Sequence, residues 1–269
     1  MMTKDPKPGT AQWLVARTLD AIASGELAPG AQIPTVPALV EKHGMNKNTV
    51  SKALQELKRV GAISGVSGSK TWVRVPPKHV KRRNVRYHEE KDAVHAVEAE
   101  RASKGVSELD SGIAVSELHE NSAKFTIMNA PEDIAEILHL PENSQVLCRV
   151  YTRRHAAQAG ISVSTSYLPL ALVAKNADIL DETREPWPGG TMHQLFTVGI
   201  EIGEIVDHVT AAMPTPDEMR DYDIPPGVPL IHIRKVSYAV DGRPVEVALI
   251  PSPADRIELI YSTPLVRWS

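Results

Sequence analysis

Hydrophobic positions between residues 44 and 61 recur at the spacing of an α-helix, and they predict one amphipathic helix there. The apolar stripe consists of Val50, Ala53, Leu54 and Leu57. Such a stripe marks the face of a helix that packs on a core. Gly44 precedes the stripe and can turn the chain with a positive φ, and Asn46 can cap the helix by accepting a backbone N–H.

The opposite face is polar and basic at the start of this helix. It carries Lys47, Asn48, Thr49, Ser51 and Lys52. Lysines with short amide and hydroxyl groups at a helix N-terminus suit a phosphate backbone and the edges of bases, so these residues are candidate DNA contacts. An ordinary surface helix would show the same stripe, and only the neighbouring elements separate the two interpretations.

The residues before this helix predict two further helices. The buried side of the first consists of Trp13, Leu14, Thr18, Leu19 and Ile22. A turn rich in proline and glycine follows over 26–34. Thr35 is the expected N-cap of the second helix, with Pro37 in its first turn. The second and third helices would then form a helix-turn-helix whose third helix enters the major groove, and Thr35 is a further candidate DNA contact.

The residues after the helix predict a β-hairpin. Positions 62–63 and 71–75 alternate as two short strands, and the loop over 65–70 lies between them. Ser69 and Lys70 are the candidate DNA contacts in this loop. A hairpin that follows a helix-turn-helix is a wing, whose tip can lie along a phosphate backbone or in the minor groove.

From about residue 112 onward the pattern changes to strands that alternate with short helices. Asp241-Gly242 is a strong hairpin turn signal in this part. Strands are expected at 113–118, 145–156, 161–169, 202–213, 229–240 and 243–250, and helices at 131–140, 169–175, 191–198 and 216–222. We therefore predict an α+β chain with a winged helix-turn-helix over 1–75, a linker over 76–109 and a second domain over 110–269.

Charge separates the two parts further. Residues 1–87 hold 15 Lys/Arg against 5 Asp/Glu, a net charge of +10, whereas residues 88–269 hold 15 against 28, a net charge of −13. A basic first part on an acidic second part indicates a polyanion bound by the first part alone. The basic cluster that begins at Lys78 belongs to the expected linker, where it is either solvated or adds contacts to phosphates.

Several other functions lack their sequence signals. The single cysteine, Cys148, excludes an intrachain disulfide and fits a reducing cytoplasm, and its apolar surroundings favour a buried hydrophobe over a redox-sensing thiol. The sequence shows no signal peptide or membrane span. It also shows no nucleophile elbow, P-loop, dinucleotide fingerprint or metal-binding spacing. We therefore expect a cytoplasmic protein that is not an enzyme and has no metal or cofactor.

The order of elements in the first quarter resembles the gluconate-operon repressor (GntR) family of bacterial transcription factors. The resemblance is carried by GELAPGAQIP (25–34), ALVEKHGMNKNTVSKALQELKRVGAI (38–63) and GSKTWV (68–73). It departs from the family at Val36 and Pro37, where an acidic and a basic residue are usual, and at Lys47, where arginine is usual. Lysine cannot make the bidentate fork to guanine, so the family's operator sequence does not carry over.

The second part resembles the effector-binding (UTRA) domain of the histidine-utilisation-repressor (HutC) subfamily. The resemblance covers about 110–265 and is carried by RVYTRR…ISVSTSYLP (149–169), GGTMHQLF (189–196), VPLIHIRKVSY…DGRPVEVA (228–248) and ADRIEL (254–259). It implies an antiparallel sheet flanked by helices, similar to chorismate lyase without its catalysis. It also implies a ligand cleft beside the sheet, and a homodimer.

The same resemblance implies particular effector contacts. Arg154 falls where an arginine commonly binds an anionic group of the effector, with Arg153 next to it, and Glu246 falls where a polar pocket glutamate is common. Ser164 and Ser166 alternate to one face of their strand. Residues 250–254 depart from the family, whose members often have a tyrosine and an arginine there, which puts the usual sugar-phosphate pocket in doubt.

These observations predict a DNA-binding transcriptional regulator, most simply a repressor. Two winged domains of a dimer would meet the half-sites of a near-palindromic operator in double-stranded DNA, and a small-molecule effector in the second domain would modulate this binding. Two alternatives stay open at this point. One is an effector-independent repressor, for example of mobile-element transfer or copy control, whose second domain only dimerises. The other is a lyase-like enzyme fused to a DNA-binding domain.

Overall fold

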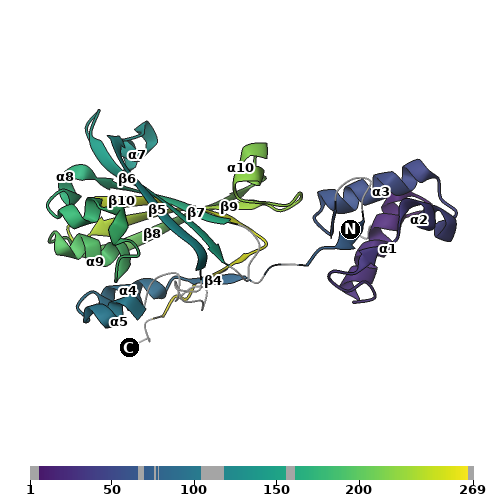
Figure 1. The fold of residues 1–269 in the computed structure, drawn as a ribbon, viewed down its shortest axis with the longest axis horizontal. Helices are drawn as coiled ribbons and strands as arrows, with labels where there is room; N and C mark the ends of the chain where they lie inside the picture. Colours follow the sequence, from purple (N-terminus) through teal and green to yellow (C-terminus); the bar gives the residue numbers. More distant parts are fainter. Residues whose placement is uncertain are drawn as a thin grey trace. The chain divides into compact units, whose positions relative to one another are not determined.

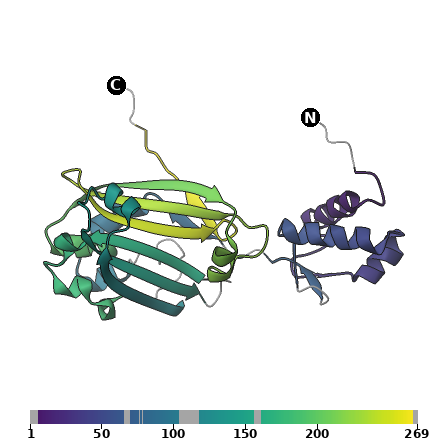
Figure 2. The same cartoon turned by 90° about the horizontal axis from the view of Figure 1, so that it is seen from above.

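The computed structural model describes residues 6–65, 70–75, 77, 79–103, 118–155 and 161–265 of the 269. It forms two compact units: the first comprises residues 1–77 together with 213–220 and 224–228, and the second comprises the rest of the chain. Both units appear in Figures 1 and 2, and each is described by itself.

The first unit is the expected winged helix-turn-helix (Figure 1). Its helices and strands are α1 (Ala11–Ala23), β1 (Gln32–Ile33), α2 (Val36–His43), α3 (Lys47–Arg59), β2 (Ile63–Ser64) and β3 (Thr71–Val73). β3 lies between β1 and β2 and pairs antiparallel with both. Leu14, Val50 and Leu57 meet in one apolar core, as the stripe on the third helix predicted. This cluster fixes the outer face of α3.

Local caps set the ends of α2 and α3 as the sequence predicted. The side chain of Thr35 accepts a hydrogen bond from the backbone N–H of Ala38 at 3.4 Å, which caps α2. Gly44 ends α2 with φ +61°, a conformation that L side chains rarely adopt. Asn46 Oδ1 then accepts from the backbone N–H of Asn48 at 2.7 Å. These caps stop one helix and start the next within three residues.

The second unit is built on a six-stranded antiparallel sheet with the order β5-β6-β7-β10-β9-β8 (Figure 2). Its strands are β5 (Leu118–Asn129), β6 (Gln145–His155), β7 (Ile161–Pro169), β8 (Ile202–Ala212), β9 (Leu230–Ala239) and β10 (Pro244–Pro253). Asp241-Gly242 makes the predicted turn between β9 and β10, with Gly242 at φ +83°. The antiparallel sheet that the resemblance implied is therefore present.

Helices cover both faces of this sheet. α7 (Glu132–Ile137) packs on one face through Ile134, which contacts Val146 and Val247. The other face packs on a second apolar cluster, in which α8 (Leu170–Val173) and α9 (Gly190–Thr197) lie against Leu147 and Val245. Two 3₁₀ turns, η2 (Ala177–Leu180) and η3 (Glu182–Arg184), precede α9, and α10 (Pro216–Asp221) follows β8. The predicted short helices are all present; α7, α8 and α10 are shorter than expected, and α9 has the expected length.

The predicted extended linker is wrong over the part that the structure describes. Residues of this stretch form β4 (Val80–Arg83), α4 (Arg86–Ala93) and α5 (Glu98–Ser103). β4 pairs in parallel with β11 (Ile257–Ile260), the last strand of the chain. Burial explains the difference, because Arg86 and Glu90 are only 3% and 8% exposed. Arg82 pairs with Asp207 and Arg83 with Glu89, so these two charges are engaged within the second unit.

Two further expectations need comment. The strand predicted at 113–118 lies outside the described residues except for its last position, where β5 begins. The prediction missed the rest of β5, an edge strand. Cys148 is buried, as predicted. No helix within the described ranges is both long and apolar enough to cross a bilayer.

Candidate functional sites

The outer end of α3 is a polar surface whose side chains make no hydrogen bond or ion pair with other described residues. Lys47, Asn48 and Lys52 are exposed, and Thr49 and Ser51 are half-buried beside them. Behind them, Val50 and Ala53 are 0% exposed and anchor the helix. An anchored helix with free donors at its N-terminal end has the geometry needed to contact phosphates and base edges.

The other predicted DNA contacts lie on neighbouring elements of the first unit. Thr35 is exposed at the start of α2, where its hydroxyl serves as the cap. Lys70 is exposed directly before β3, and Ser69 lies outside the described residues. Two basic residues near the end of α3 are engaged: Lys58 Nζ donates to the Gly65 carbonyl at 2.9 Å, and Arg59 pairs with Glu56. The free cations therefore gather at the beginning of the helix.

The second unit holds a buried ionic cluster on the sheet face that packs against α9. Arg149 of β6 is 0% exposed, and its Nη2 donates to Ser166 Oγ at 2.9 Å and lies 3.4 Å from Glu246 Oε1. Glu246 is 2% exposed and pairs with Lys235 Nζ at 2.8 Å. Burial alone would raise the pKa of Glu246, but the charges of Lys235 and Arg149 outweigh it and lower the pKa to about 2. The carboxylate is therefore ionised.

The cluster continues across the sheet toward β4. Lys235 of β9 lies opposite Asp207 of β8 in the register, so the two side chains share a face. Asp207 accepts a hydrogen bond from Tyr87 Oη at 3.0 Å and lies 3.3 Å from Arg82 Nη2. Arg82 belongs to β4 and Tyr87 to α4. The first elements of the second unit are thus joined to the ionic cluster by charged groups rather than by apolar packing alone.

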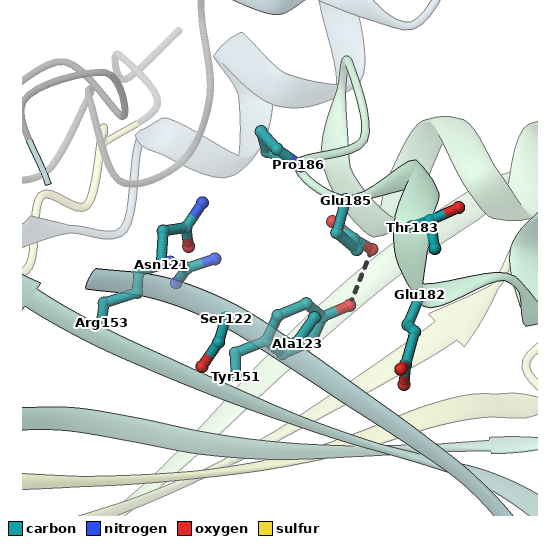
Figure 3. Close-up of a pocket in the computed structure, with 9 residues that line it drawn as sticks. All are labelled: Asn121, Ser122, Ala123, Tyr151, Arg153, Glu182, Thr183, Glu185 and Pro186. Carbon is teal, nitrogen blue, oxygen red and sulfur yellow. Dashed lines mark hydrogen bonds between the residues drawn. The ribbon is translucent and has the colours of Figure 1, made fainter. Parts of the chain in front are cut away.

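A pocket of about 270 Å³ opens at the other end of this face, between β5, β6 and η3 (Figure 3). It is lined by Asn121, Ser122, Ala123, Tyr151, Arg153, Glu182, Thr183, Glu185 and Pro186. Figure 3 shows the Arg153 side chain beside Asn121, its partner in the β5–β6 register. Tyr151 Oη donates to Glu185 Oε1 at 3.0 Å, and burial together with Glu185 raises the pKa of this phenol far above its ordinary value. Tyr151 is therefore a neutral hydrogen-bond donor.

One glutamine joins the pocket to the ionic cluster. Gln194 of α9 is 1% exposed; its Nε2 donates to Glu185 Oε1 at 3.2 Å, and its Oε1 accepts from Arg149 Nη1 at 2.5 Å. A continuous series of polar contacts therefore leads from Glu185 in the pocket to Arg149 and on to Glu246. Such a series gives a bound molecule a physical connection to the ionic cluster.

The structure brings four of the five predicted effector residues to one face of the sheet. Arg153 lines the pocket, Ser164 lies opposite Tyr151 in the register, and Ser166 and Glu246 belong to the ionic cluster. Arg154 is the exception, because alternation along β6 places it on the opposite face. The pocket is thus lined by Arg153 and not by Arg154, the residue on which the prediction centred.

Sequence reasoning missed several residues of this site. Arg149 and Lys235 were not predicted, although a basic residue inside an apolar strand is a usable signal, since arginine and lysine are rarely buried without a partner. Glu185 and Gln194 gave no such signal, because they reach the sheet from a loop and a short helix. No cluster of metal-ligating side chains exists among the residues for which the structure gives positions.

Comparison with known families matches both units. Residues 10–73 match the family described as bacterial regulatory proteins, gntR family, and residues 116–258 match the UTRA domain. The second match spans more than half of the chain. Both agree with the helix-turn-helix and with the antiparallel sheet described above.

The individual relatives are transcriptional regulators, and each match covers most of both chains. An uncharacterised HTH-type transcriptional regulator of Streptomyces coelicolor is 27% identical over 250 residues, covering 90% of this chain and 88% of the relative. A probable fructoselysine utilization operon transcriptional repressor of Escherichia coli is 24% identical, covering 90% of both chains. A crystal structure of a GntR-family transcriptional regulator has a TM-score of 0.64 at 21% identity, covering 95% of this chain and 98% of that one, and so shares the fold.

These relatives confirm the expectation of a regulator and not an enzyme. With both family matches in place, the chain belongs to the GntR family of DNA-binding transcriptional regulators and carries a UTRA domain as its second unit.

Proposed function

We propose that this regulator is a repressor that binds a near-palindromic operator as a homodimer, and that a small molecule bound by its UTRA domain modulates the binding. The observation that carries the proposal is the outer end of α3, where lysine, amide and hydroxyl side chains are presented on a helix anchored by fully buried residues. A repressor, rather than an activator, is supported by the names of relatives such as the Escherichia coli protein above.

The contacts follow from the chemistry of these side chains. Lys47, Lys52 and Lys70 supply positive charge for phosphates, and Asn48, Thr49 and Ser51 supply the directional donors and acceptors that can read base edges. Two copies would place two such helices on half-sites about one helical turn apart. Because chromosomal DNA is the proposed partner, we expect the protein to act in the cytoplasm.

The effector would act through the second unit. A ligand changes operator affinity only if it binds the DNA-competent and DNA-incompetent states with different affinities. The pocket offers a place for such a ligand, and the contacts from Glu185 through Gln194 and Arg149 offer a route toward β4, the strand that follows Pro77. Modulation therefore needs no contact between the ligand and DNA.

The test of the DNA site is the double variant Lys47→Ala/Thr49→Ala. A duplex selected by the wild-type protein from a random library serves as the operator in mobility-shift titrations. We expect the variant to lose at least about 100-fold in affinity, because one phosphate contact and one base contact disappear, and to sediment like the wild-type protein. Lys175→Ala is the control, since this exposed lysine follows α8 in the second unit and lies outside the basic cluster that begins at Lys78. Unchanged binding by the double variant would remove α3 as the reading helix.

An effector-independent repressor is the second candidate function. It is favoured by the state of Glu246, which two serines and two basic residues already satisfy from within the fold, and by residues 250–254, which lack the tyrosine and arginine of the family. A thermal-shift screen with sugar phosphates, amino acids and fatty acids separates the two functions. A compound that stabilises the protein and also weakens the operator shift contradicts effector independence.

A further inference from the structure

Arg153 is the unsatisfied cation of the pocket. Its Nε is buried and has no hydrogen-bond partner among the described residues. Its guanidinium lies 5.5 Å from the centre of the Tyr151 ring, which holds its orientation. A guanidinium presents a planar fork of N–H donors that fits a carboxylate bidentately. Removal of this group from water without a partner is unfavourable, so an anionic group of a ligand at this point has a specific electrostatic advantage.

The carboxyl groups of the pocket are fixed in place by the protein. Glu185 Oε1 accepts from Tyr151 Oη and Gln194 Nε2, and its Oε2 accepts from the backbone N–H of Trp187 at 2.9 Å. Glu182 is exposed at the rim, where its Oε2 accepts from the backbone N–H of Phe125 at 2.8 Å. Glu185 Oε2 and the carboxylate of Glu182 can each accept a further hydrogen bond, whereas Glu185 Oε1 already accepts two. The pocket therefore presents preorganised acceptors within one small cavity that also holds a cation.

The balance of charges selects among ligands. One guanidinium and two carboxylates line the pocket, and the other lining side chains are uncharged. A phosphate dianion would pair with Arg153 but be repelled by both carboxylates, and a plain amine would pair with a carboxylate but leave Arg153 without an anionic partner. A molecule with one carboxylate and one ammonium satisfies both ends. The volume of about 270 Å³ lies below the range of about 300–1,000 Å³ that is typical of ligand pockets, so a small molecule fits.

We propose that the UTRA pocket binds a small zwitterion, with its carboxylate on Arg153 and its ammonium group between Glu185 and Glu182. The proposal rests on the proposed function in one respect, since it names the class of effector for the modulated repressor. It also assigns Arg153, rather than Arg154, as the anion-binding residue. Tyr151 and Gln194 hold Glu185 in position and carry the effect of binding to Arg149.

The experiment uses the full-length protein and three matched sets of probes. The first set contains the standard L-amino acids and their N-methylated and betaine forms. The second contains the corresponding amines and the corresponding acids that lack the amino group, and the third contains hexose 6-phosphates as dianions. Calorimetric titration should give saturable binding for at least one zwitterion and at least tenfold weaker binding for its amine and its acid. Binding by no zwitterion, or tighter binding of a phosphate, overturns the proposal.

Variants locate the site and separate it from a folding defect. Arg153→Met and Glu185→Gln should each weaken binding of the zwitterion at least tenfold, whereas Arg154→Met, on the opposite face of β6, should bind as the wild-type protein does. Loss of binding in Arg154→Met but not in Arg153→Met would contradict the assignment. Each variant is first checked for an unchanged operator shift without ligand. If the wild-type protein shifts the operator but binds no zwitterion, only this inference is contradicted. If it shifts no operator, the proposed function is contradicted.

Discussion

The two units bury different kinds of residues. In the first unit, the buried side chains of the described residues are all apolar, and the polar side chains with functional chemistry lie on the surface of α3. In the second unit, polar and charged side chains are buried beside the apolar ones, because Arg149, Gln194 and Glu246 are nearly or fully buried. The difference fits the proposed partners. A DNA duplex is large and is met by an exposed surface, whereas a small-molecule effector would have to be surrounded.

The reversal has an energetic consequence. An apolar core tolerates many substitutions of similar volume, but a buried ion pair leaves an uncompensated charge when one partner is removed. The two units should therefore respond differently to the loss of a single polar group. Hydrogen exchange, followed peptide by peptide, measures the response of each unit separately in the full-length protein.

The largest expected effect comes from Glu246→Gln. The amide keeps the shape, but its single carbonyl oxygen can accept from only one of Ser166 and Ser237, and it leaves Arg149 and Lys235 without their counter-charge. We expect the second unit to lose about 3–5 kcal/mol of unfolding free energy, with no change in protection of the first unit. Glu258→Gln, at an exposed position of β11, is the control and should change stability by less than about 0.5 kcal/mol.

The loss of stability that Glu246→Gln causes should also depend on pH. Because the folded pKa of Glu246 is lowered from 4.5 to about 2, its stabilising contribution is complete above pH 4.5 and is lost as the pH falls toward 2. The gap in unfolding free energy between the wild-type protein and Glu246→Gln should therefore shrink over this window. A gap that stays constant down to pH 2 would show that lost packing, not charge, causes the destabilisation.

A smaller effect is expected in the first unit from Asn46→Ala. The substitution removes the side-chain oxygen that caps α3 but leaves the apolar core intact. We expect a loss of about 1 kcal/mol, confined to peptides of the first unit. Asn46→Asp retains a capping oxygen and should recover most of this stability. A loss as large as that of Glu246→Gln would mean that the first unit also depends on a polar network.

The smallest effect, of opposite sign, is expected from Glu90→Gln. Burial raises the pKa of Glu90, although Lys235 and Arg86 partly oppose this. Since a raised pKa means that ionisation of this group disfavours the folded state near pH 7, the amide should stabilise the second unit, by up to about 1 kcal/mol. The gain should disappear below pH 4.5, where the carboxyl is protonated in both states. A loss of stability at pH 7 would indicate that Glu90 acts as a needed counter-charge.

The two units also differ in how far the sequence predicts them. The first unit follows local rules: a cap at Asn46, a left-handed glycine at Gly44 and a helical stripe each act within a few residues. In the second unit, strong alternation and turn signals located β6 to β10. β5 was missed because it is an edge strand with an irregular pattern of exposure, and β4 because it is short and pairs with a strand at the far end of the chain.

The pocket beside β5 and β6 was the hardest part to predict. The resemblance to UTRA domains pointed to β6, but two neighbouring arginines on this strand lie on opposite faces of the sheet, and sequence alone does not say which face carries a pocket. The η3 segment lines the pocket and is joined to β5 by a hydrogen bond in which the backbone N–H of Phe125 donates to Glu182. Such contacts join segments far apart in sequence, so no local pattern records them.

The parallel pairing of β4 with β11 bears on how the protein is made. Translation completes the winged unit early, whereas β11, the partner strand of β4, is made only after the six strands of the large sheet. At about 5–20 residues per second, the interval between the two is on the order of ten to forty seconds. A nascent chain therefore carries a finished winged unit well before the second unit can close.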